Sequence, residues 1–348
     1  MLQPLPTLLN QLEQMRSRDV PYVLVTLIGV QGNSTRKLGA RMWVAQDGFT
    51  LGSVSFGSCG DGEIKKQIES VLEAGTARRL SFLVGEDEDT ELGLACTGDL
   101  EVFLEPNPTQ LQINWELALN RLERRETVVT AVLLEETNQE TNQEANQEAR
   151  HGFREESSHL GLARAKIQET PKHTAFLERW TPPPHLVIIG ANPISGPLSR
   201  MAREVGCVVT IFDATPEKLN PEEFPGVQNL LTGDLEQVLN LEQSDIWTAV
   251  VVVSHNYADE VFALRAALSS AAGYLAVLAS ERRGRALLRF LEDLGFSKNQ
   301  LERVRTPAGL DLGLDTPAGI ALSILSEMTA TLNRRTGVPF VQKQLIER

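Results

Sequence analysis

A single cysteine set among glycines is the feature of the first half of the chain best suited to chemistry. Cys59 lies in the segment Gly57-Ser58-Cys59-Gly60, which further glycines flank on both sides. Glycines expose backbone N–H groups and leave room for a ligand beside the sulfur, so the segment could hold an anion or a metal-containing cofactor, with Cys59 as a soft ligand. A helix predicted over residues 62–72 follows, and its N-terminus would favour the thiolate. The alternative is a small, inert residue in a turn.

Basic side chains in a second glycine-rich segment could add a phosphate contact. Arg36 and Arg41 lie on either side of Gly39, and a guanidinium group matches the geometry of a phosphate. Scattered basic residues on a surface are the alternative. The other two cysteines, Cys96 and Cys207, occur in apolar runs and are predicted to be buried in strands. The sequence has no CxxC motif and no Cys/His cluster, so we expect no structural zinc.

The second half carries a glycine turn at the position typical of a dinucleotide-binding domain. The apolar run VIIG ends at Gly190, where such a domain has G-x-G-x-x-G and directs a helix N-terminus at the pyrophosphate. Asn192 occupies the second glycine position and Ser195 the third, while Pro193 and Pro197 lack backbone N–H groups. These residues disfavour tight binding of NAD(P).

Two polar residues follow predicted strands of this half. Asp213 comes 23 residues after Gly190, which suits an acidic residue that binds ribose hydroxyls. A turn cap that involves Thr215 is an equal alternative for Asp213. His255 follows the run VVVVS and is placed at the carboxyl edge of the sheet, where ligands bind. A lone histidine in such a loop is more often structural or solvated.

The scaffold for these residues is predicted from the apolar patterns. The first half has strand-like runs rich in β-branched and aromatic residues together with amphipathic helical patterns, which indicates an α+β domain. From residue 182, continuous apolar strands alternate with helices, as in a Rossmann-like parallel sheet covered on both faces. The boundary is placed at the Pro182-Pro183-Pro184 spacer, giving an α/β protein with domains 1–181 and 182–348. The polar NQE repeats at 135–150 are predicted to be an inserted loop.

Composition and charge exclude several classes of protein. The 348 residues are 42% hydrophobic, enough for the cores of two domains. A formal net charge of -13 opposes a phosphate backbone, so no nucleic-acid partner is expected. Residues 1–20 read as an amphipathic helix rather than a signal peptide, and no apolar stretch reaches the roughly 18 residues that would span a bilayer. We therefore expect a cytoplasmic protein with no membrane segment.

Four parts of the sequence, the first of them made of two segments, together resemble the xanthine dehydrogenase accessory factor family (XdhC/CoxI). They are GNSTRKLGARMWV with GSVSFGSCGDGEI, then LGLACTGDLEVFLEP, PPPHLVIIGA, and TPAGLDLGLDTPAGIALSILSEM, and the last is the most specific. The resemblance covers nearly the whole chain. The sequence differs from the family pattern close to G-S-V-S-G-G-C at Phe56 and Ser58. It also differs from the family turn G-A-G-H at Asn192 and Pro193.

The resemblance implies a homodimeric chaperone rather than a turnover enzyme. Such a protein binds newly made molybdenum cofactor, assists its sulfuration and delivers it to an apo-hydroxylase, its client. Cys59 is implied as the residue next to the cofactor and as the metal ligand. The whole candidate cofactor-binding set is Arg36, Gly39, Arg41, Gly57, Cys59, Gly60, Gly190, Asn192, Asp213 and His255.

Two other functions stay open at the level of sequence. The parallel-sheet domain and Asp213 fit an NAD(P)-dependent oxidoreductase, although no residue stands out as the acid or base of hydride transfer. A protein that has kept the family fold without chemistry would act as a scaffold or regulator that binds a partner enzyme through its acidic surface.

Overall fold

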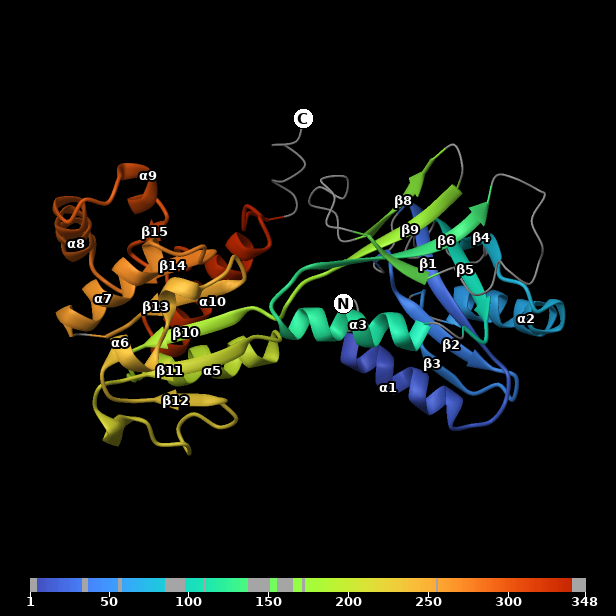
Figure 1. The fold of residues 1–348 in the computed structure, drawn as a ribbon, viewed down its shortest axis with the longest axis horizontal. Helices are drawn as coiled ribbons and strands as arrows, with labels where there is room; N and C mark the ends of the chain where they lie inside the picture. Colours follow the sequence, from blue (N-terminus) through green and yellow to red (C-terminus); the bar gives the residue numbers. More distant parts are fainter. Residues whose placement is uncertain are drawn as a thin grey trace. The chain divides into compact units, whose positions relative to one another are not determined.

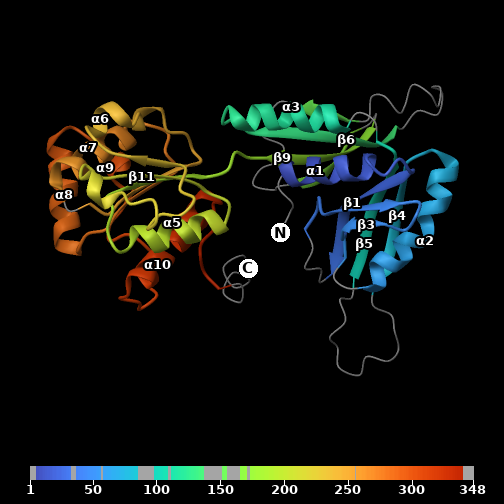
Figure 2. The same cartoon turned by 90° about the horizontal axis from the view of Figure 1, so that it is seen from below.

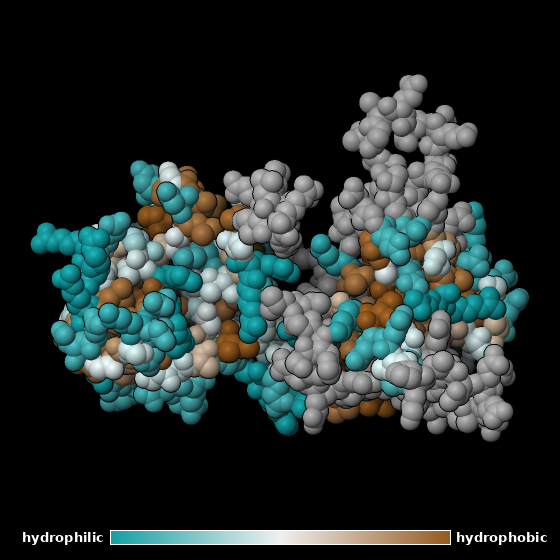
Figure 3. Space-filling view, turned by 90° about the horizontal axis from the view of Figure 1, so that it is seen from above, coloured by the Kyte–Doolittle hydropathy of each residue, from teal (hydrophilic) through white to brown (hydrophobic). Residues whose placement is uncertain are grey.

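The computed structural model describes residues 5–32, 37–55, 58–84, 98–108, 111–136, 151–154, 165–170, 173–254 and 256–339. The chain divides into two units, Met1–Pro182 and Pro183–Arg348. Figure 1 shows the first unit in blue to green and the second in yellow-green to red. Hydrophobic side chains lie among hydrophilic ones on the surface (Figure 3). No helix in these described ranges is long and apolar enough to cross a membrane.

An antiparallel sheet with the order β3-β2-β1-β5-β4 forms the centre of the N-terminal unit. Its core follows the alternation of the strands, because successive side chains point to opposite faces. Val23 and Val25 belong to one apolar cluster with residues of α2, while Leu24 belongs to another with residues of α1 and α3. Figure 2 shows α1 beside α3, with α2 apart from them. The elements are α1 Leu5–Arg16, β1 Tyr22–Gly32, β2 Arg41–Ala45, β3 Thr50–Gly52, α2 Ser58–Ala74, β4 Arg78–Val84, β5 Gly98–Pro106 and α3 Leu111–Glu123.

The helix α2 begins at Ser58, four residues before the predicted start at residue 62. The prediction rested on the apolar spacing of Ile64, Ile68, Val71 and Leu72, which does not extend back to Ser58. Asp61 fixes the preceding chain, because its Oδ1 accepts hydrogen bonds from the Ser55 backbone N–H at 3.2 Å and from the Ser55 hydroxyl at 2.8 Å. Cys59 therefore lies in the first turn of the helix and not before it.

A second antiparallel sheet, with the order β7-β6-β9-β8, completes this unit. It packs against the first sheet through Ile28, Phe103 and Phe176. A register shift between Leu133 and Glu135 bends the pairing of β6 with β9. The strands are β6 Val128–Glu136, β7 His151–Arg154, β8 Ala165–Glu169 and β9 His173–Trp180. The prediction of a mixed N-terminal α+β unit is confirmed.

The C-terminal unit has a six-stranded parallel sheet with the order β12-β11-β10-β13-β14-β15. Numbered within the unit this is the order 3-2-1-4-5-6 of the doubly wound dinucleotide-binding fold. The Rossmann-like fold class is confirmed. The strands are β10 His185–Ile189, β11 Val208–Phe212, β12 Asn229–Leu231, β13 Thr248–Val252, β14 Tyr274–Val277 and β15 Val304–Arg305.

Helices cover both faces of this sheet. The strands β10 and β13 carry apolar residues at nearly every position because both of their faces are buried. The helices α5 and α10 pack on one face, and α7 and α8 pack on the other. The helices are α5 Ser195–Glu204, α6 Leu235–Val238, α7 Tyr257–Leu268, α8 Glu281–Asp293, α9 Lys298–Leu301 and α10 Pro317–Leu332.

Candidate functional site

The turn that joins β10 to α5 requires glycine at its first position. Gly190 has φ +110°, and a Cβ atom there would lie 2.6 Å from the Ser254 backbone nitrogen. Both the left-handed backbone and the close approach of the chain beyond β13 exclude a larger residue. Gly190 thus places the turn directly against the end of the neighbouring strand.

Two side chains close this turn from within. The Asn192 side chain donates from Nδ2 to the Val253 carbonyl at 2.8 Å and accepts the Ile194 N–H at Oδ1, also at 2.8 Å. The Ser195 hydroxyl donates to the Gly190 carbonyl at 2.7 Å and accepts the Asn192 N–H at 3.2 Å. The two residues at the second and third glycine positions therefore form an internal hydrogen-bond network.

The network leaves the turn poorly suited to a pyrophosphate. A dinucleotide-binding turn offers its backbone N–H groups to the phosphates. Here the N–H groups of Gly190, Ala191, Asn192, Ile194 and Ser195 all donate to acceptors within the protein. Proline at 193 and 197 adds no donor. The residues present do not fit a bound NAD(P).

Asp213 belongs to the same network. One carboxylate oxygen accepts the Ala191 N–H at 2.8 Å and the other accepts the Thr215 N–H at 2.9 Å, while Lys218 Nζ lies 3.5 Å away. Burial acts to raise the pKa of Asp213, but the two amide donors and Lys218 outweigh it and hold that pKa below its ordinary value. The turn-capping contact with Thr215 is thus present, whereas the role in ribose binding stays a prediction.

The start of α7 lies beside this turn. Asn256 accepts the Ala258 N–H at 3.0 Å and caps the helix. Asp259 has a raised pKa, chiefly because burial disfavours its charged form and also because Asp213 is near. His255, between these elements, lies outside the described residues. Within the described part of the chain, no three His, Cys, Asp or Glu residues are grouped as a metal site.

Arg41 in the N-terminal unit is buried in an ion pair. Its Nη2 lies 2.7 Å from Glu178 Oε2, and its Nη1 donates to the Gly39 carbonyl at 3.0 Å. The guanidinium carbon lies 5.2 Å from the ring centroid of Trp115 and 5.6 Å from that of Trp180, within cation–π range. The guanidinium predicted to bind phosphate is thus held by groups of the protein itself.

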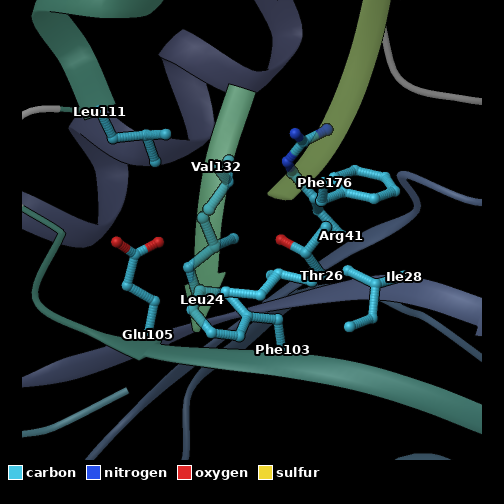
Figure 4. Close-up of a pocket in the computed structure, with 10 residues that line it drawn as sticks. Leu24, Thr26, Ile28, Arg41, Phe103, Glu105, Leu111, Val132 and Phe176 are labelled. Atoms are coloured by element: carbon cyan, nitrogen blue, oxygen red, sulfur yellow. The ribbon is translucent and has the colours of Figure 1, made fainter. Parts of the chain in front are cut away.

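A narrow pocket lies beside this ion pair, between the two sheets (Figure 4). Glu105 and Arg41 stand on its two sides, and most of the other lining residues are apolar. The Arg41 Nε atom is buried and has no hydrogen-bond partner among the described residues. The pocket is small enough that a water molecule bound to Arg41 fits it better than an organic cofactor does.

Sequence reasoning missed the two buried glutamates of this region, although strand alternation carries a signal for them. Glu178 shares its face of β9 with Phe176 and Trp180, and Glu105 shares its face of β5 with Phe103. A carboxylate on the same strand face as buried aromatic residues points into the core, and a buried charge requires a partner. The partner of Glu178 is Arg41.

The other predicted site residues are placed as follows. Gly39 lies in a tight turn with φ +87°, and its N–H donates to the Leu27 carbonyl at 2.8 Å. Cys59 and Gly60 lie in the first turn of α2. Arg36 and Gly57 lie outside the described residues. In the N-terminal unit the structure brings Gly39 and Arg41 together. In the C-terminal unit it brings Gly190, Asn192 and Asp213 together in the turn after β10.

The closed turn yields a direct prediction about nucleotides. We expect no saturable heat when the whole protein is titrated with NAD, NADH or NADPH up to about 1 mM in a calorimeter, since binding would have to break the network of Asn192 and Ser195. Saturable binding by the wild-type protein below that concentration would contradict the expectation and show that the turn opens.

Comparison with known proteins agrees with this architecture. Residues 186–328 match the model of the XdhC Rossmann domain, and residues 15–83 match that of the XdhC and CoxI family. The chain is 24% identical over 328 residues to a probable subunit of xanthine dehydrogenase in Bacillus subtilis, covering 90% of this chain and 93% of that protein. It is 25% identical over 311 residues to the molybdenum cofactor insertion chaperone PaoD of Escherichia coli, covering 88% of this chain and 82% of PaoD.

A solved structure has the same fold. It is described as a xanthine dehydrogenase from Bacillus halodurans and superposes with a TM-score of 0.69 at 22% identity, covering 94% of this chain and 96% of that one. Two family models that match separate parts of the chain, and relatives that extend across both units, lead to one assignment. The chain belongs to the XdhC and CoxI family.

Proposed function

We propose that this protein binds the molybdenum cofactor and assists its insertion into a molybdenum hydroxylase of the xanthine dehydrogenase type. The observation that carries the proposal is the similarity, over 88% of the chain, to a relative named as a molybdenum cofactor insertion chaperone. The match to a probable subunit of xanthine dehydrogenase supports the kind of client. The protein would act as a homodimer in the cytoplasm.

The candidate residue for cofactor contact is Cys59. It lies in the first turn of α2, a helix of 17 residues, where the positive end of the helix dipole stabilises a thiolate and attracts an anion. A thiolate is a soft ligand of the kind that binds transition metals. The cofactor is cargo in this proposal, so Cys59 would hold it and then release it to the client.

The C-terminal unit supports a chaperone better than an oxidoreductase. Hydride transfer needs a bound nicotinamide cofactor, and the turn that would hold its pyrophosphate is closed by Asn192 and Ser195. The unit would then act through its surface, with its sheet as a rigid support.

The proposal is tested by retention of the cofactor. Purified protein is incubated with molybdenum cofactor and desalted, and the retained molybdenum and molybdopterin are measured. We expect Cys59→Ala to retain at least about tenfold less than the wild type, since a metal–thiolate bond is lost. Cys207→Ala is the matched control, because burial raises the pKa of the Cys207 thiol to about 11 and keeps it inert.

The possible outcomes test the role of Cys59 and the chaperone function separately. Equal retention by wild type and Cys59→Ala would remove Cys59 from the proposal and leave the chaperone function standing. Absence of retention by the wild type would overturn the function itself.

A further inference from the structure

Three exposed leucines occur in α10 and in the segment just before it. Leu312 is 44% exposed, Leu314 is 49% exposed and Leu322 is 42% exposed. Leu314 lies against Gly319 in the first turn of α10, and Leu322 lies three residues further along the same helix. Residues three apart share a helix face, so Leu322 lies on the side of α10 that Leu314 covers at Gly319. We call these two leucines, with Leu312 two residues before Leu314, the leucine surface.

The chain that carries Leu312 and Leu314 is fixed at its start by α10. The Gly309 N–H donates to Glu327 Oε2 at 2.9 Å, and the Ser323 hydroxyl donates to the Leu310 carbonyl. Gly309 has φ +100°, and a Cβ atom there would collide with Ser323. The Tyr274 hydroxyl donates a hydrogen bond to the same carboxylate oxygen of Glu327 at 2.7 Å. The segment is therefore anchored to both the helix and the sheet.

Its far end is fixed as well. Thr316 caps α10, because its side-chain oxygen accepts the Gly319 N–H at 3.1 Å. Gly319 allows the close approach of Leu314, since a Cβ atom there would lie 2.5 Å from the Leu314 Cβ. Two exposed leucines on a segment held at both ends lose little conformational entropy on binding. A group of preorganised apolar side chains is typical of an interaction surface, whereas single exposed leucines are ordinary.

The charges beside the leucine surface indicate the kind of partner that would bind it. Asp311 and Asp315 are exposed and flank the two loop leucines, and no Lys or Arg occurs between Arg305 and Arg334. A twofold contact that placed these two aspartates opposite those of a second copy would bring like charges together, which is unfavourable. A partner with an apolar recess bordered by Lys or Arg side chains matches both features.

We propose that the leucine surface docks the client hydroxylase, through an apolar recess with a basic border on that enzyme. The identity of the partner rests on the proposed function, but the leucine surface contains none of the residues proposed to contact the cofactor. Leu312 and Leu314 would enter the recess, and Asp311 and Asp315 would pair with its border and speed the encounter.

The test uses purified full-length protein and the apo-hydroxylase of the same organism, with affinity measured by biolayer interferometry. We expect Leu312→Ser/Leu314→Ser to weaken binding at least about tenfold, because central apolar anchors dominate an interface. The matched control is Ile113→Ser/Leu117→Ser, which removes two leucine-sized side chains that are 60% and 48% exposed on α3 of the other unit. The control should change affinity less than about twofold.

A second variant tests the charges and does not depend on the leucines. Asp311→Lys/Asp315→Lys should weaken binding by a similar factor, and the affinity of the wild type should fall as salt is raised. Circular dichroism of each variant should match the wild type, since all four side chains are exposed. Unchanged affinity of both the leucine and the aspartate variants would overturn the proposal, as would a wild type that does not bind the hydroxylase.

Two further measurements separate this proposal from its alternatives. Light scattering should give the same mass for the wild type and the leucine variant. A dimer that the leucine substitutions convert to monomer would assign the surface to a second copy and overturn docking of the client. Cofactor retention should also be unchanged in these variants, so that failure of retention in the wild type would reject the proposed function while the binding result stands by itself.

Discussion

Replacing Arg41 with alanine should destabilise the N-terminal unit by about 3–5 kcal/mol, because it leaves the buried Glu178 carboxylate without its partner. The guanidinium is also held between Trp115 and Trp180, and its loss removes these contacts. Removal of one member of a buried ion pair costs more than the net value of the pair, since an uncompensated charge stays in the interior.

Urea unfolding followed by tryptophan fluorescence measures this effect. A Trp247→Phe background leaves tryptophan only at positions 43, 115 and 180, so the signal reports the N-terminal unit. The matched control is Arg18→Ala, which breaks the exposed pair of Arg18 with Asp47 and should cost less than about 1 kcal/mol. If Arg41→Ala cost no more than this control, the buried pair would not stabilise the unit.

A third variant separates charge from packing. Arg41→Met/Glu178→Leu removes both charges and keeps apolar volume, so it should recover most of the stability lost in Arg41→Ala. Recovery would show that the cost arises from the unpaired carboxylate. Failure to recover would assign it instead to the packing of Arg41 between the aromatic rings.

Replacing Gly190 with alanine should destabilise the C-terminal unit by roughly 3 kcal/mol or more, the sum of a backbone cost and a steric one. The φ of +110° is strained for any residue with a Cβ, and that atom would lie 2.6 Å from the Ser254 nitrogen and 2.8 Å from its Cα. Backbone on both sides cannot move without breaking the contact between β10 and β13.

Gly206→Ala is the matched control for this effect. Gly206 has φ +89° in the same unit, but a Cβ atom there would meet no other atom within 4 Å, so only the backbone cost of about 1–2 kcal/mol is expected. Urea unfolding, with hydrogen exchange of peptides that cover β10 and β13, measures both variants. Equal losses for the two substitutions would show that the turn can move away from Ser254.

Most of the fold could be predicted from local patterns in the sequence. Apolar runs and amphipathic periods along the second half predicted the parallel sheet and its helices, and glycine, asparagine and proline at 190–197 predicted an impaired nucleotide turn. These features are local, because a strand, a helix or a missing N–H group depends on neighbouring residues. The start of α2 was predicted too late, since the anchoring of Asp61 by Ser55 is a contact that apolar spacing does not include.

Contacts between distant residues decided the candidate sites. The Asn192 side chain reaches Val253, 61 residues away, and Arg41 reaches Glu178, 137 residues away. The sequence showed that Asn192 would obstruct a phosphate, but only the packing of β10 beside β13 gave its amide an acceptor. Likewise the sequence by itself determined the layers of this protein, while the tertiary structure decided that Arg41 lies inside, because burial of a charge depends on a partner that folding alone brings near.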